Sequence, residues 1–133
     1  MNKVALVVGG GQTLGAFLCE GLAKEGYDVV VADLNQESAV GTAKDIEGKY
    51  KVSTLGVKVD AANEDDVNKM MDAIKEKCGR VDLLVYSAGI ARSHKITNFP
   101  LADWNLSMAV NTTGYFLCAR EVSKLMIEKE IKG

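Results

Sequence analysis

The stretch Val4-Ala5-Leu6-Val7-Val8-Gly9-Gly10-Gly11-Gln12-Thr13-Leu14-Gly15 decides the fold of this chain. Its first five residues form an apolar run rich in β-branched side chains, which predicts a buried strand. Apolar residues then recur at helical spacing from Leu14 to Leu22, so a glycine turn joins a strand to a helix. Glycine lets a ligand approach the backbone, and a helix N-terminus favours a phosphate group. The stretch therefore predicts a phosphate site, with an ordinary tight turn as the alternative.

A second apolar run, 29–32, ends in Asp33, about 20 residues beyond the turn. A dinucleotide-binding unit places there the acid that accepts hydrogen bonds from the adenosine ribose hydroxyls. The alternative is that Asp33 caps a helix or ends a strand in solvent. The glycine turn upstream favours the ribose role.

The rest of the chain repeats the alternation of strand and helix. Glycines and charged turns separate four expected strands, at about 3–8, 28–33, 51–59 and 81–86. Helices are expected at about 13–25, from the cap Asn35 to Gly48, from the cap Asn63 to Gly79, and at about 101–130. This order predicts a parallel sheet with helices on both faces. The expected fold is α/β: a Rossmann-type, doubly wound, three-layer α/β/α domain over residues 1–133, with strand order 3-2-1-4.

Polar and glycine residues follow each of the four expected strands. They are Gly9–Gly15, Asp33, Asp60 and Ser87–Gly89. In an open α/β sheet, ligands bind beyond the carboxyl ends of the strands at the point where the strand order reverses. The convergence of these four strand ends is the strongest evidence for a ligand site that the residues themselves provide.

Composition excludes several classes of protein. The chain has 133 residues, one domain by length, and its net charge is −2. We find no basic stripe for nucleic acid or for a membrane surface, and the apolar start is too short for a signal peptide or membrane span. One histidine and no close cysteine pair indicate no metal site. The isolated Cys19, Cys78 and Cys118 are interpreted as reduced structural thiols of a cytoplasmic protein.

Over its whole length the sequence resembles the short-chain dehydrogenase/reductase family. The family's cofactor turn reads Thr-Gly-x-x-x-Gly-x-Gly; here Gly9 and Gly15 match, while Val8 and Thr13 replace the threonine and the middle glycine. Asp33 matches members that prefer NAD, because a carboxylate repels the 2′-phosphate of NADP. The resemblance implies an NAD site made of Gly9, Gly11, Gln12, Thr13, Leu14, Gly15, Asp33, Asp60, Ala61, Ser87, Ala88 and Gly89.

Two further segments carry the resemblance. Tyr86-Ser87-Ala88-Gly89 stands where the family has Asn-Asn-Ala-Gly, and Asn111 matches the family's catalytic asparagine. In the family that asparagine holds a helix irregularity and a water; the alternative is a polar residue at a helix kink. The changes at Thr13 and Tyr86-Ser87 are shared with a subgroup that oxidises a sugar-alcohol phosphate with NAD. Reversible oxidation of such a substrate is therefore the implied function.

The family's remaining catalytic residues are a Ser, a Tyr and a Lys four positions after that Tyr. No tyrosine of this chain has a lysine four residues later. We therefore expect the NAD-binding part of the enzyme, truncated before the Ser/Tyr/Lys region, with a sheet incomplete relative to the family and no activity of its own. The alternative is a non-catalytic NAD-binding or interaction module that is complete at 133 residues.

Partners follow from the same reasoning. Arg92, near His94 and Lys95 in the loop after Gly89, is a candidate for the substrate phosphate, with a solvated loop as the alternative. An apolar fourth strand left at the sheet edge predicts a homo-oligomer.

Trp104 and Phe116 are expected in the core. A phospho-receiver domain is disfavoured, because it needs clustered acids where this chain has the glycines.

Overall fold

The sheet has the expected parallel order. The computed structural model describes residues 2–133, so only Met1 of the expected domain lies outside the described residues. The strands are β1 (Val4–Val8), β2 (Asp28–Asp33), β3 (Thr54–Lys58) and β4 (Leu83–Tyr86). They lie in the order β3-β2-β1-β4, with every neighbouring pair parallel. The predicted strand order 3-2-1-4 is confirmed.

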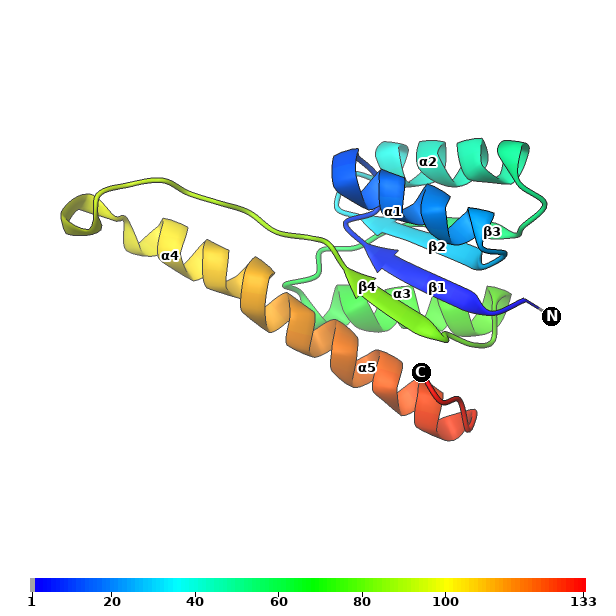
Figure 1. Ribbon diagram of the computed structural model, residues 1–133. Helices are drawn as coiled ribbons and strands as arrows, with labels where there is room; N and C mark the ends of the chain where they lie inside the picture. The colour runs from blue at the N-terminus through cyan, green and yellow to red at the C-terminus, as the bar shows by residue number, and fades with distance from the viewer. Residues whose placement is uncertain (1) are drawn as a thin grey trace.

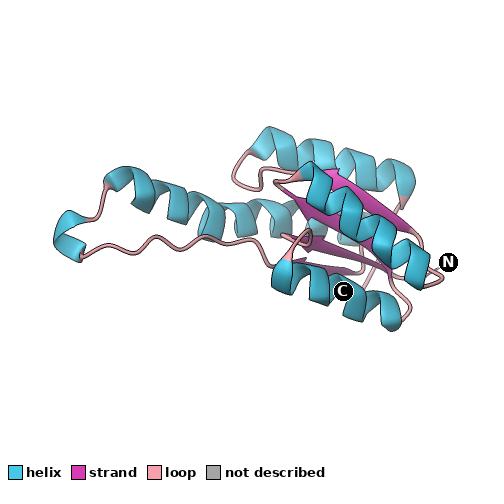
Figure 2. Ribbon diagram, turned by 90° about the horizontal axis from the view of Figure 1, so that it is seen from above, coloured by secondary structure: helices cyan, strands magenta, loops and turns pink. Residues whose placement is uncertain are grey.

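Helices cover both faces of the sheet and complete three layers (Figure 1, Figure 2). Those on one face are α1 (Thr13–Lys24) and α2 (Gln36–Lys49); those on the other are α3 (Glu64–Lys77) and α5 (Gly114–Glu128). A 3₁₀ turn, η1 (Ile96–Asn98), precedes α4 (Leu101–Met108), and a π-helix, η2 (Ala109–Thr113), joins α4 to α5. The predicted doubly wound α/β/α architecture is confirmed.

Both predicted asparagine caps are present. The side-chain oxygen of Asn35 accepts a hydrogen bond from the Ser38 N–H at 3.0 Å and starts α2. Asn63 accepts from the Asp66 N–H at 3.0 Å and starts α3, whose first turn is acidic and so complements the helix dipole.

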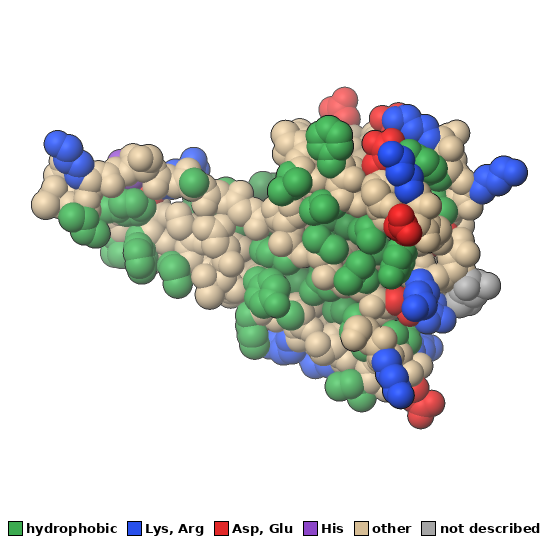
Figure 3. All heavy atoms as spheres, in the orientation of Figure 1, with side chains coloured by type: hydrophobic (Ala, Val, Ile, Leu, Met, Phe, Trp, Pro, Cys, Tyr) green, Lys and Arg blue, Asp and Glu red, His purple; other side chains and the backbone are tan. Residues whose placement is uncertain are grey.

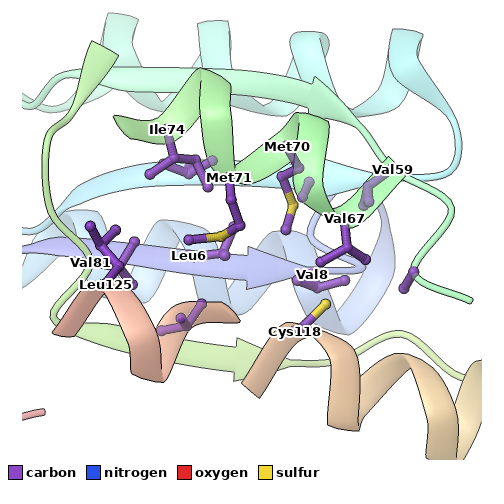
Figure 4. Packing of buried hydrophobic residues seen from close by; sticks show 14 of the residues in the cluster. Leu6, Val8, Val59, Val67, Met70, Met71, Ile74, Val81, Cys118 and Leu125 are labelled. Atoms are coloured by element: carbon purple, nitrogen blue, oxygen red, sulfur yellow. The ribbon is translucent and has the colours of Figure 1, made fainter. Parts of the chain in front are cut away.

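The core lies on both sides of β1, because successive side chains of a strand point to opposite faces. Leu6 and Val8 face α3 and α5, where Met70 and Met71 fill the space between strand and helix (Figure 4). Val7 faces α1 and α2. Full burial of each such side chain stabilises the fold by about 1.5–3 kcal/mol.

The expectation that Trp104 and Phe116 belong to the core is wrong. Their exposed fractions are 53% and 55%. The segment before α4, and α4 itself, project beyond the sheet (Figure 1). The Trp104 ring makes an edge-to-face contact with the Phe99 ring, 6.5 Å between centroids. Phe116 lies on the outer side of α5 beneath the Arg120 guanidinium. Figure 3 shows apolar side chains gathered along this projecting part of the molecule.

Several expected bounds are off by a residue or two, and α2 runs through the expected stop at Gly48 to Lys49. Three further differences stand out. β3 begins at residue 54, not 51, because the side chain of Asp28 takes the Ser53 N–H at 2.8 Å. β4 begins at residue 83, not 81, because the Asp82 carboxylate accepts the Val4 N–H at 2.8 Å. The single helix expected over 101–130 ends at residue 128 and is interrupted by η2.

Candidate functional site

A pocket of about 300 Å³ opens beyond the carboxyl ends of the four strands. It brings together residues that lie far apart in the sequence and that follow four different strands. The lining residues are Val8, Gly9, Gln12, Thr13, Asp33, Leu34, Val59, Asp60, Ala61, Ser87, Ala88, Gly89, Ile90 and Val110.

The glycines of the turn are required by close backbone packing. Gly9 has φ +84°, and a Cβ added there would lie 2.6 Å from the Ala88 nitrogen at the end of β4. A Cβ on Gly15 would collide with the Gly9 carbonyl oxygen. The turn therefore lies directly against the fourth strand, with the start of α1 packed onto it.

The Asp33 carboxylate ties the turn to the end of β2. One of its oxygens accepts the Gly11 N–H at 3.0 Å, and the other accepts the Asn35 N–H at 3.0 Å. Because Asn35 caps α2, the alternative in which Asp33 is that cap is wrong. Asp33 is half-buried and faces the pocket with its negative charge anchored by two backbone donors.

Helix α2 holds the turn from its other side. The Thr42 hydroxyl donates to the Gly11 carbonyl at 2.9 Å, and the Gln12 amide donates to the Ser38 hydroxyl at 2.7 Å. These contacts fix the turn before any ligand arrives, which limits the entropy lost on binding.

The N-terminus of α1 points its unpaired N–H groups at the turn. Its first turn contains no acidic residue, so the positive end of the helix dipole is not compensated there by a carboxylate. Thr13, the first residue of α1, has φ +47°, a left-handed conformation that is rare for β-branched residues. Thr13 thus keeps a glycine-like backbone at the place where the family pattern has glycine.

The ends of β3 and β4 form the opposite wall. Asp60 accepts the Ala62 N–H at 3.1 Å, which closes a tight turn after β3. The Ser87 N–H donates to the Val8 carbonyl at 2.8 Å and extends the pairing of β1 and β4 by one residue beyond Tyr86.

Asn111 lies in η2, outside the pocket lining, and binds the backbone of the loop after β4. Its side-chain oxygen accepts the Ile90 N–H at 2.9 Å, and its amide donates to the Ile90 carbonyl at 2.9 Å. Ile90 in turn lines the pocket. The helix irregularity expected at Asn111 from the family resemblance is present as η2.

Not every expected residue lines the pocket. Gly11, Leu14 and Gly15 shape the turn and the start of α1 without being part of the lining. Arg92 lies on the projecting segment, where its guanidinium is 3.9 Å from Asp103, a carboxylate that also binds His94 at 2.7 Å. The residues that sequence reasoning missed are apolar: Val8, Leu34, Val59, Ile90 and Val110. Each of them directly flanks a predicted residue, and Val110, the neighbour of Asn111, reaches the pocket through the packing of η2.

The described residues show free cysteines and neither a metal-binding cluster nor a membrane-spanning helix. The three cysteines are free, and burial raises the pKa of Cys19 to about 12 and that of Cys118 to about 11, which keeps both thiols protonated. Within residues 2–133, no group of three or more His, Cys, Asp or Glu side chains could hold a metal ion. Across the same residues, no helix is both long and apolar enough to cross a membrane.

The strand order, the glycine turn and the pocket at the reversal point define the Rossmann class of doubly wound α/β proteins. The chain belongs to the short chain dehydrogenase family, which matches it over residues 3–133.

Individual relatives narrow the similarity. The chain is 52% identical over 134 aligned positions to sorbitol-6-phosphate 2-dehydrogenase of Escherichia coli, covering 100% of this chain and 52% of the relative. It is 36% identical to D-threitol dehydrogenase of Mycolicibacterium smegmatis, covering 96% of this chain and 48% of that protein. The crystal structure of sorbitol-6-phosphate 2-dehydrogenase from Erwinia amylovora superposes with a TM-score of 0.94 at 56% identity, covering 97% of this chain and 51% of that one. The chain thus spans about half the length of these relatives, and the resemblance to a sugar-alcohol phosphate subgroup is confirmed.

Proposed function

We propose that residues 1–133 are the NAD-binding part of an oxidoreductase that transfers hydride between NAD and a sugar-alcohol phosphate. The observation that carries this is the convergence of four strand ends on one pocket, with the Asp33 carboxylate hydrogen-bonded to the glycine turn. The names of the relatives at 52% and 56% identity support sorbitol 6-phosphate, oxidised to fructose 6-phosphate, as the substrate.

The residues fit a dinucleotide. The cradle at Gly9–Gly15 has no room for a Cβ at Gly9 or Gly15, and it presents the start of α1 to a pyrophosphate. Asp33 would bind the adenosine ribose, Asp60 and Ala61 the adenine, and Ser87–Gly89 the part of the cofactor nearer the substrate. NAD, when bound, would supply the hydride acceptor.

Asp33 would select NAD over NADP. Both of its oxygens already accept backbone N–H groups, so the carboxylate cannot turn away from a 2′-phosphate. Titration calorimetry should find NAD bound at least about tenfold more tightly than NADP, because two like charges about 4 Å apart near a protein surface repel by about 4 kcal/mol, and a tenfold ratio needs only about 1.4 kcal/mol. Asp33→Asn should narrow this ratio, whereas Glu37→Gln, which removes an exposed charge from the first turn of α2, should not. Equal affinities of the unaltered chain for NAD and NADP would contradict the assignment.

Within this chain the catalytic contribution is Asn111, which holds the loop after β4 through Ile90. The sequence contains no Tyr-x-x-x-Lys, so the proton exchange of the family has no donor here. We expect the 133-residue chain to bind NAD without oxidising sorbitol 6-phosphate. NADH formation by a preparation verified by intact mass would overturn this.

Arg92 is the proposed ligand of the substrate phosphate, which would compete with Asp103 for the guanidinium. In a catalytically active form that carries this chain, Arg92→Ala should raise the KM for sorbitol 6-phosphate and leave NAD affinity unchanged. An unchanged KM would remove Arg92 from the site.

Three free thiols suit the reducing cytoplasm, where we place the protein.

A further inference from the structure

The π-helix η2 leaves one backbone carbonyl without its usual helical partner. In a regular α-helix the Gly114 N–H would donate to the Val110 carbonyl, four residues earlier. Here it donates to the Ala109 carbonyl, five residues earlier. The Val110 carbonyl therefore loses the Gly114 N–H as a donor, and this part-buried oxygen is open to a donor from outside the helix.

The hydroxyl of Tyr86, the last residue of β4, supplies that donor at 2.5 Å from the Val110 oxygen. The Tyr86 ring is fixed by an edge-on contact with the Tyr115 ring, with centroids 5.7 Å apart. A Cβ on Gly114 would collide with the Tyr86 hydroxyl, so this glycine makes room for the contact. Burial raises the pKa of Tyr86 to about 12, and the hydroxyl keeps its proton at neutral pH.

The same turn of η2 carries Asn111, next to Val110 in the chain. Asn111 holds Ile90 through two hydrogen bonds of 2.9 Å, and a Cβ on Gly89 would lie 3.4 Å from the Asn111 oxygen. Ile90, Gly89 and Val110 all line the pocket. A displacement of η2 would therefore move one wall of the pocket.

We infer that Tyr86 is a positioning residue: by holding the Val110 carbonyl it fixes the π-turn, which lets Asn111 hold Ile90 in the wall of the pocket. Tyr86 itself does not line the pocket and so acts through its neighbours. The role in cofactor binding rests on the proposed function, whereas the mechanical link between Tyr86 and Ile90 does not.

The test compares Tyr86→Phe with Tyr115→Phe in the 133-residue chain. Both substitutions remove one phenolic oxygen from the same ring pair, but only the first removes the donor to Val110. Native-state amide exchange followed by NMR should be about tenfold faster at Ile90 in Tyr86→Phe, the effect of one lost hydrogen bond. Exchange at Val30 and Val31, in the buried strand β2, should be unchanged, and Tyr115→Phe should match the unaltered chain at all three amides.

Gly114→Ala disturbs the same contact from the helix side and keeps the test decisive if Tyr86→Phe does not fold. It should also speed exchange at Ile90 selectively, although alanine favours helix. Unchanged exchange at Ile90, or equal acceleration at Val30 and Val31, would overturn the inference. NAD affinity, measured in parallel, should fall by up to about tenfold in Tyr86→Phe. If the unaltered chain binds no NAD, the proposed function fails, while the exchange ratios still decide the role of Tyr86.

Discussion

Two glycines of one helix should respond in opposite directions to the same substitution. Gly15 and Gly21 both lie in α1, so replacing either with alanine gains about 1 kcal/mol of helix propensity. A Cβ at Gly21 meets nothing within 4 Å. A Cβ at Gly15 would lie 2.8 Å from the Gly9 carbonyl carbon and 2.9 Å from Gly10 Cα, besides colliding with the Gly9 oxygen. These atoms belong to the backbone of the glycine turn and cannot rotate away.

Overpacking of this kind costs about 1–3 kcal/mol or more, which exceeds the gain in propensity. In urea unfolding followed by circular dichroism, the free energy of unfolding of Gly21→Ala should be higher than that of the unaltered chain by up to about 1 kcal/mol. Gly15→Ala should fall below it; because the gain in propensity is common to both variants, they should differ by the overpacking cost, about 1–3 kcal/mol. Equal stability of the two variants, or a more stable Gly15→Ala, would refute the packing of α1 against the turn.

Three further results are expected. Thr13→Gly should stabilise the fold by up to about 1 kcal/mol in urea unfolding, because it relieves φ +47°, whereas Gln12→Gly, at φ −145°, should not. Asp82→Asn should lower the free energy of unfolding by about 1–3 kcal/mol at neutral pH, which is the stabilisation that the Asp82 carboxylate contributes. The Arg80 guanidinium holds the pKa of Asp82 below its ordinary 3.8, so this stabilisation is full above that pH and is lost as the pH falls through the lowered value; a deficit that persists in acid would contradict it. Sedimentation should detect self-association through the β4 edge and α5; a clean monomer at micromolar concentration would count against it.

The fold was predictable because each of its signals is local. The β-branched runs of β1 and β2, the caps Asn35 and Asn63 and the alternation of elements can all be read from short stretches of sequence. The glycine turn after β1 then indicates the doubly wound arrangement with its strand order 3-2-1-4. The polar part of the pocket was predictable for the same reason, since its residues follow directly after strands.

What the sequence did not reveal depends on tertiary placement. Nothing local in the 101–130 window shows that α4, with Trp104, leaves the sheet, or that Phe116 lies on the outer side of α5. Both aromatic side chains are therefore expected in a core that does not reach them. Val110 lines the pocket because η2 packs against the end of β4, where the Tyr86 hydroxyl binds the Val110 carbonyl. The link from Tyr86 to Val110 joins residues 24 positions apart and has no periodic signature.

The central claim is that four strand ends form one dinucleotide site, and an NMR titration of the 133-residue chain with NAD tests it most directly. The account predicts saturable shifts at the amides of the glycine turn, Asp33, Asp60 and Ser87–Gly89, with little change at the far ends of the strands, near Asp28 and Asp82. Absence of saturable shifts, or shifts centred away from these four strand ends, would contradict it.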